Sequence, residues 1–163
     1  MREILTYPDP RLKRVAGEIG SPSKELSKLI DTLENMMVTS GHSVGIAAPQ
    51  IGEAVRLVVA DASLGKKPSE NHGRLILINP EIVSHSGFTT TREGCMSVPD
   101  YTGNVGRAMQ VVVHYLDRNF EPRVLNAGGF EAILLQHEID HLNGILFIDR
   151  VVSRRTDLFR RKA

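Results

Sequence analysis

Residues 129–143 constrain the fold most, because their apolar side chains would point in nearly every direction around a helix. Those side chains belong to Phe130, Ile133, Leu134, Leu135, Ile139 and Leu142. A helix that is apolar nearly all round is stable only when it is buried. Gly128 and Gly129 precede the segment and Gly144 follows it, as expected for glycines at helix ends. We therefore predict a buried helix that ends at Asn143 and is enclosed by the rest of the chain.

An amphipathic helix is predicted nearer the N-terminus, from Ser23 to about Ser40. Its apolar residues recur at helical spacing: Leu26, Leu29, Ile30, Leu33, Met36 and Met37. Ser21 is the expected N-cap, Pro22 the expected first helical residue, and Gly41 the expected terminator. One stripe of this helix should pack on the core.

Four short segments rich in β-branched residues predict strands, at residues 55–60, 74–79, 87–93 and 110–117. A run of strands followed by a buried helix is typical of an α+β domain rather than of alternating βαβ units. We predict one domain over residues 1–163, with antiparallel sheets packed around the buried helix. A short third helix with a basic surface is expected at residues 154–162.

The composition excludes several classes of protein. With 41% hydrophobic and 24% charged residues, the chain is neither disordered nor collagen-like. The formal net charge of +1 does not indicate general attraction to DNA or to a membrane. No apolar run approaches the length of a bilayer span, and the single cysteine cannot form an internal disulfide. We expect a cytoplasmic protein with no membrane or DNA partner.

The predicted buried helix carries the motif H-E-x-x-H at residues 137–141. His137 and His141 are one helical turn apart, so both imidazoles can reach a common point. Glu138 lies about 100° further round the helix, where it can contact a water on a metal without ligating the ion. Unpaired imidazoles in apolar surroundings would be costly, which argues against a merely structural pair. The motif therefore predicts a metal site.

The third ligand must come from elsewhere in the chain. A metzincin would place histidine where this sequence has Phe147, and no glutamate occurs after Glu138. Asp149 and Asp157 are available but lack a supporting pattern. Cys95 would ordinarily be a small buried hydrophobe, but a nearby pair of histidines changes that expectation because a thiolate binds zinc and iron strongly. A Cys-His-His site leaves a fourth position open for water, as catalytic sites do.

Three segments in this order resemble the peptide deformylase family: SVGIAAPQ (43–50), EGCMS (93–97) and QHEIDHLNG (136–144). The entry segment, NPEIV at residues 79–83 and the total length fit as well. The resemblance therefore covers essentially the whole chain. Its three motifs, with the lone cysteine in the second, are highly specific together.

This resemblance implies that Cys95, His137 and His141 hold one divalent metal, usually Fe(II) in the cell. Zn, Ni or Co could occupy the same site in purified protein, because the order of metal affinities does not select among them. Glu138 would act as general base and then as general acid. The implied reaction is hydrolysis of the N-formyl-methionyl end of newly made polypeptides to formate and a free N-terminus.

The resemblance also implies how the substrate would lie. The formyl oxygen would be held by the metal, the side-chain amide of Gln50 and the backbone N–H of Met96. The peptide backbone would pair in strand-like fashion with Val44, Gly45 and Gly94. The methionine side chain would enter a pocket formed by Val44, Phe130, Ile133, Leu134 and His137.

Two positions depart from the family pattern. The family usually has glycine at the position of Ser43, and many members have arginine at that of Thr102. Neither departure removes a ligand or the base, although contacts beyond the first substrate residue are left open.

Asp140 needs a partner on a buried helix, so we expect it to pair with Arg107 and steady the ligands.

Two alternative functions follow from other features. Residues 41–45 read G-x-S-x-G, the nucleophile-elbow pattern of serine hydrolases, but that elbow requires a strand before the serine and a helix after it. The other alternative is a binding module that kept the fold and lost the chemistry. The intact Glu138 and the complete ligand set argue against that module.

The C-terminal segment is strongly basic, which suggests a further partner. Its cations are Arg150, Arg154, Arg155, Arg160, Arg161 and Lys162. Such a run is usually a solvated helix face. Because the implied substrate is a new chain at the ribosome, we hypothesise that this face contacts ribosomal RNA.

Overall fold

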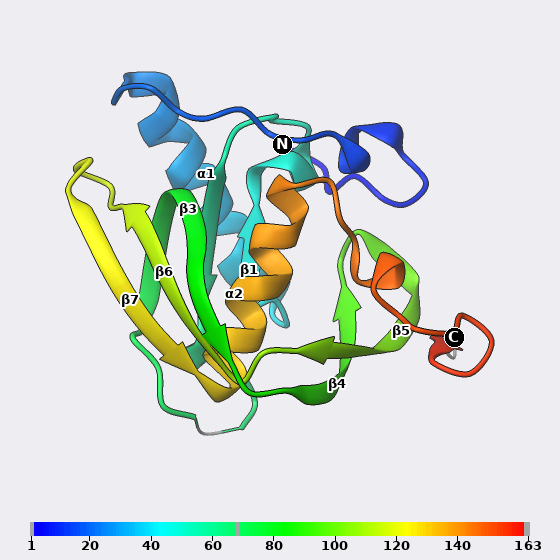
Figure 1. Ribbon diagram of the computed structural model, residues 1–163. Coiled ribbons are helices and arrows are strands. Elements are labelled where there is room, and N and C mark those ends of the chain that lie inside the picture. Colours follow the sequence, from blue (N-terminus) through cyan, green and yellow to red (C-terminus); the bar gives the residue numbers. More distant parts are fainter. Residues whose placement is uncertain (1, 68, 162–163) are drawn as a thin grey trace.

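The computed structural model describes residues 2–67 and 69–161 (Figure 1). Within them the α-helices are α1 (Lys24–Ser40) and α2 (Gly129–Leu142). Short 3₁₀ helices occupy Pro10–Lys13, Ala48–Ile51, Ala62–Leu64 and Phe147–Asp149. No helix in this part of the chain combines the length and the apolar character that crossing a membrane requires.

The strands form two antiparallel sheets. The five-stranded sheet has the order β1-β2-β3-β6-β7, with β1 (Gly45–Ala47), β2 (Leu57–Asp61), β3 (Arg74–Ser86), β6 (Gln110–Leu116) and β7 (Pro122–Gly128). The three-stranded sheet has the order β4-β5-β8, with β4 (Thr89–Cys95), β5 (Val98–Arg107) and β8 (Leu158–Arg160). The predicted α+β class, with antiparallel sheets, is therefore confirmed.

Strand β2 of the five-stranded sheet is buried on both faces, by α2 on one side and α1 on the other, whereas β7 is exposed along most of its length. Along β2, Val58 and Ala60 belong to the core shared with α2, whereas Leu57 and Val59 belong to the core shared with α1. This alternation follows from the period of two of a β-strand. In Figure 1, α2 lies between this sheet and the strands β4 and β5. The helix is thus enclosed on several sides, which explains its apolar composition.

A separate core joins the three-stranded sheet to the chain that follows α2. Val98 and Val105 of β5 pack with Leu146 and Phe147, and Leu12 completes the cluster from the N-terminal segment. The side chain of Cys95 is partly buried against this cluster. The end of β4 is thereby held next to the last turns of α2.

Helix α1 begins at Lys24, close to the predicted start at Ser23, but its N-cap is two residues later than expected. Ser23 is its N-cap, and the Ser23 hydroxyl accepts a hydrogen bond from the Leu26 N–H at 3.0 Å. The expectation of Ser21 as cap and Pro22 as first helical residue is therefore wrong. The C-terminal end is as predicted, because Gly41 has a left-handed φ of 79°.

Helix α2 begins at Gly129 and ends at Leu142, one residue before the predicted end. Asn143 is its C-cap, and Gly144 follows with φ 72°. A Cβ on Gly144 would also overlap the carbonyl of Lys13. Glycine is therefore required here, both because φ is positive and because there is no room for a side chain.

Four strands were not predicted, and one predicted helix is wrong. The strands β1, β5, β7 and β8 lack a long β-branched run, and each is fixed by pairing with a neighbour instead. The expected helix at 154–162 is replaced by a turn at residues 154–156 and by β8. The edge of β5 offers this segment backbone partners, with Thr102 opposite Phe159. Residue 162 lies outside the described residues.

The capping assignment makes a stability prediction. Replacing Ser23 by alanine removes the acceptor for the Leu26 N–H and should lower the free energy of unfolding by about 1 kcal/mol. Urea denaturation monitored by circular dichroism measures this change. The matched control is Ser21→Ala, which should leave the midpoint unchanged; an equal loss from both substitutions would contradict the assignment.

Candidate metal centre

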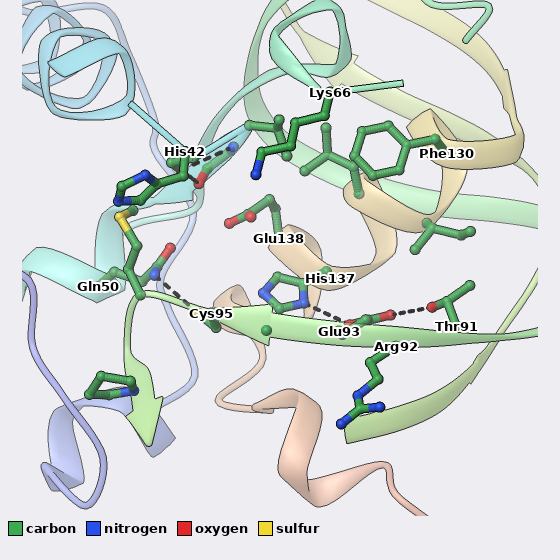
Figure 2. A pocket seen from close by; sticks show the side chains of 18 of the residues that line it. His42, Gln50, Lys66, Thr91, Arg92, Glu93, Cys95, Phe130, His137 and Glu138 are labelled. Atoms are coloured by element: carbon green, nitrogen blue, oxygen red, sulfur yellow. Dashed lines mark hydrogen bonds and ion pairs between the residues drawn. The ribbon is translucent and has the colours of Figure 1, made fainter. Parts of the chain in front are cut away.

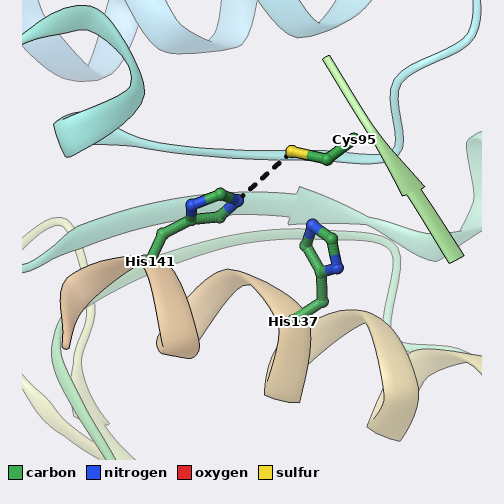
Figure 3. A group of neighbouring side chains, drawn as sticks. All are labelled: Cys95, His137 and His141. Carbon is green, nitrogen blue, oxygen red and sulfur yellow. Dashed lines mark hydrogen bonds between the residues drawn. The ribbon is translucent and has the colours of Figure 1, made fainter. Parts of the chain in front are cut away.

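Three predicted ligands converge at the contact between α2 and the end of β4 (Figure 3). One ligand atom from each of Cys95, His137 and His141 lies within 4.8 Å of the other two. Cys95 Sγ is 3.4 Å from His141 Nε2. The two imidazoles come from successive turns of α2, with ring centroids 5.1 Å apart. The sulfur and both rings can therefore reach a single ion.

The thiol is placed where its ionised form is favoured. Burial alone would raise the pKa of Cys95, but the adjacent His141 and His137 outweigh burial and hold the pKa well below its usual range. The backbone N–H of Ser97 also donates to the sulfur at 3.4 Å. A thiolate is the form of cysteine that binds a metal.

Glu93 fixes the orientation of His137. Its carboxylate oxygen Oε1 is 2.8 Å from His137 Nδ1, which leaves Nε2 of the ring for the metal. Burial would raise the pKa of Glu93, but hydrogen bonds from Arg107 and His137 outweigh burial and lower the pKa to about 2. Glu93 is therefore an anion at neutral pH.

Arg107 connects Glu93 to the ligand helix through buried ion pairs. Its Nε and Nη2 donate to the two oxygens of Glu93 at 2.7 and 2.8 Å. Its Nη1 donates to Asp140 Oδ2 at 2.7 Å, so the expected pairing of Asp140 with Arg107 is confirmed. Arg150 adds two donors to Asp140 from the outside, at 2.5 and 2.7 Å. Arg150 is thus tied to α2 rather than part of a free basic face.

Glu138 lies beside the ligands, and one of its oxygens is without a partner. Glu138 Oε1 is buried and has no hydrogen-bond partner among the described residues. Burial raises the pKa of Glu138, against the opposing effect of His137 and His141. A Cβ on Gly45 would lie 2.8 Å from Glu138 Oε2, so only glycine lets β1 approach this carboxylate so closely.

Gln50 presents its amide nitrogen to the site. The backbone N–H of Ala47 donates to Gln50 Oε1 at 2.9 Å, which determines that Nε2 points the other way. Nε2 lies 3.1 Å from Ser97 Oγ and 3.5 Å from Cys95 Sγ. Because Gln50 is 1% exposed, this donor is held in a fixed position.

A cavity of about 810 Å³ opens onto these groups (Figure 2). Its lining includes every predicted site residue except His141: Val44, Gly45, Gln50, Gly94, Cys95, Met96, Phe130, Ile133, Leu134, His137 and Glu138. His141 is buried behind them and touches the sulfur. The structure thus brings together residues from three segments that are far apart in the sequence.

The residues present fit a divalent metal. One thiolate and two imidazoles are donors that zinc and iron accept, and the cavity leaves space beside them for water or substrate. The orphaned Glu138 Oε1 is the second indication, since a buried carboxylate oxygen normally has a partner. A water or substrate atom next to the ion would supply that partner.

Glu93 and Ser97 were missed as members of the site by the sequence interpretation. Both flank Cys95 in the motif EGCMS, so their position in the sequence was a signal. The role of Glu93 depends on the strand β4, which turns Glu93 and Cys95 to the same face, and Ser97 lies in the turn between β4 and β5. That orientation could be recognised only once β4 was known to lie against α2.

The serine-hydrolase alternative does not fit the fold. Ser43 follows helix α1 and precedes strand β1, the reverse of a nucleophile elbow. Its hydroxyl donates to the carbonyl of Gly45 at 2.7 Å. The G-x-S-x-G pattern therefore marks a helix end and the turn into β1.

The fold and the site together define a class of protein. It is an α+β domain in which the H-E-x-x-H helix and the single thiol form a group that could hold a metal ion, beside a buried glutamate. The family model described as polypeptide deformylase matches residues 1–157. The peptide deformylase of Syntrophobacter fumaroxidans is 42% identical over 160 residues, which are 98% of this chain and 92% of that relative. This chain belongs to the peptide deformylase family.

Solved structures agree with that assignment. The crystal structure of a peptide deformylase from Legionella pneumophila has a TM-score of 0.85 at 40% identity and covers 94% of this chain and 87% of that one. A Met-Ala-Ser-bound class I type b peptide deformylase from Acinetobacter baumannii also has a TM-score of 0.85, at 34% identity over 93% of this chain and 98% of that one.

The hydrogen bond from Glu93 to His137 makes a prediction about metal affinity. Glu93→Gln removes the negative charge that orients the ring, and should weaken metal binding about 10- to 100-fold. Titration with the metal against a competing chelator measures the affinity, and circular dichroism verifies that the variant is folded. The exposed Glu70→Gln is the control. An unchanged affinity in folded Glu93→Gln protein would show that the ring is oriented without this carboxylate.

Proposed function

We propose that the protein removes the formyl group from the N-terminal formylmethionine of newly made polypeptides, by hydrolysis to formate and a free amine. The observation that carries this proposal is the orphaned Glu138 Oε1 in a cavity shared with Cys95, His137 and Gln50. Membership in the peptide deformylase family supports the substrate. Such an enzyme would work in the cytoplasm, where these polypeptides are made.

The proposed metal is Fe(II), held by Cys95, His137 and His141, and the donor set suits Zn, Ni and Co as well. A metal in this position would polarise the formyl carbonyl and lower the pKa of water. Metal analysis of protein purified without oxygen, paired with formate release for each metal, identifies the active ion.

Glu138 is the proposed proton carrier. Its carboxylate would take one proton from the attacking water as the oxygen bonds to the formyl carbon. The same proton would pass to the amine nitrogen as the carbon–nitrogen bond breaks. The second proton of the water stays on the formic acid product, which ionises to formate. Burial raises the pKa of Glu138, which favours a role as a group that both accepts and donates a proton.

Gln50 and the backbone N–H of Met96 are the proposed donors to the formyl oxygen. Negative charge develops on that oxygen as water adds, so fixed donors stabilise the transition state. The bond from Ala47 to Gln50 holds the side-chain amide before substrate arrives. No reorganisation of this group is then required during the reaction.

The substrate peptide is proposed to lie between two strand edges. Both β1 and β4 are edge strands of their sheets, and both line the cavity. An extended peptide can add to such edges through backbone hydrogen bonds, which supports roles for Val44, Gly45 and Gly94. Phe130, Ile133 and Leu134 project from the first turns of α2 and offer an apolar pocket for the methionine side chain.

The basic C-terminal segment is proposed to contact ribosomal RNA. Arg154, Arg155 and Arg160 are exposed, and phosphate contacts of this kind weaken as salt rises. The double substitution Arg154→Gln/Arg155→Gln should reduce co-sedimentation with ribosomes at low salt, whereas Arg14→Gln should not. Binding that is independent of salt, or unchanged in the double variant, would contradict this contact.

The role of Glu138 can be tested separately from metal binding. Glu138→Gln preserves the shape of the side chain but cannot accept the proton, so formate release from formyl-Met-Ala-Ser should fall about 10²- to 10⁴-fold. Its metal content should stay that of the unaltered protein. The exposed Glu70→Gln is the matched control, and a chelator should abolish activity. Undiminished turnover in Glu138→Gln would refute the assignment, and failure of the loaded protein to release formate would refute the function.

A further inference from the structure

Arg92 and Arg161 form a positively charged rim of the cavity on the outer side of strand β4, which we call the cationic lip. Glu93 and Cys95 face α2, so the pleat turns Arg92 and Gly94 to the opposite side. Figure 2 shows Arg92 pointing away from His137 while Glu93 points toward it. Arg161 directly follows β8, and its backbone N–H donates to the Asp100 carbonyl at 2.8 Å; its Nη2 occupies the space that a Cβ on Gly94 would need. Both Arg92 and Arg161 line the cavity.

The charges of this cationic lip, Arg92 and Arg161, are not neutralised within the described part of the chain. Arg92 donates to the hydroxyl of Thr102 at 3.1 Å, and its guanidinium lies 3.7 Å from the centre of the Phe159 ring. Neither arginine forms an ion pair with any described carboxylate. The carboxylates that line the cavity are buried, and Glu93 is already bound by Arg107 and His137.

The position of the cationic lip indicates which part of a peptide it would meet. This step rests on the proposed function, in which an extended peptide pairs with β4. Successive side chains of a strand point to opposite faces. If the methionine side chain points toward Phe130 and Leu134 of α2, the next side chain points toward Arg92 and Arg161. Guanidinium groups bind carboxylates well because their donors match the two oxygens.

We propose that Arg92 and Arg161 make the enzyme prefer peptides with aspartate or glutamate directly after formylmethionine. Thr102 and Phe159 hold Arg92 in place, so binding an acidic side chain requires little ordering of that arginine. The exposed charges are partly screened, so the expected preference is modest. It should also weaken with salt.

The test compares matched substrates. The kcat/KM for formyl-Met-Glu-Ser should exceed that for the neutral formyl-Met-Gln-Ser about three- to tenfold at low salt, with formyl-Met-Lys-Ser lower still. The Glu-to-Gln ratio should approach one in Arg92→Gln/Arg161→Gln and at about 1 M salt. Calorimetric affinities of both peptides for the inactive Glu138→Gln protein should show the same preference, which gives a readout independent of turnover.

Controls distinguish the cationic lip from other cations. Arg14→Gln removes an exposed arginine far from the cavity in the sequence and should leave the ratio unchanged. Lys66 enters the cavity from the opposite wall (Figure 2), so Lys66→Gln should also retain the preference. Loss of the preference in Lys66→Gln alone, or equal cleavage of the Glu and Gln peptides by the unaltered enzyme, would overturn this proposal and leave the proposed function standing. Failure to cleave any of these peptides would overturn both.

Discussion

The buried ion pairs of Arg107 are the interaction on which the site depends. Arg107 belongs to β5, Glu93 to β4 and Asp140 to α2, so one guanidinium joins the smaller sheet to the ligand helix. Burying charges is costly unless each is paired, and the bidentate contact with Glu93 and the second arginine on Asp140 satisfy that requirement. Glu93 then orients His137. The orientation of His137 therefore depends on the buried charges of Glu93, Arg107 and Asp140.

The sequence predicted the centre better than the fold around it. The spacing of His137 and His141 on an all-round apolar helix specifies its own geometry, because one turn of helix sets their separation. Cys95 had no such local rule and was assigned as a ligand through the nearby histidines and the family motifs. Glu93 and Arg107 could not be placed together from the sequence, since their contact depends on the antiparallel pairing of β4 with β5.

Most errors in the predicted fold have one cause, which is strand pairing between segments that are distant in the sequence. The segment that contains β8 is rich in arginine and locally compatible with a helix, but Leu158–Arg160 lie beside an open edge of β5 and pair with it. Strand β1 is only Gly45–Ala47, too short to show a pattern, and it is fixed by β2. Tertiary context overrides local preference at these positions. The N-cap error is different, because Ser21 and Ser23 are equally good caps and the local chain path selects between them.

The ligands come from two separately packed parts of the molecule, with the sulfur on β4 and the rings on α2. An ion bound to all three would act as a cross-link between the smaller sheet and the helix. Because such an ion binds the native arrangement and not the opened one, it shifts the balance toward the closed form by mass action. Separation of β4 from α2 would release such an ion. The rate of ion loss and the rate of local opening would then report the same structural change.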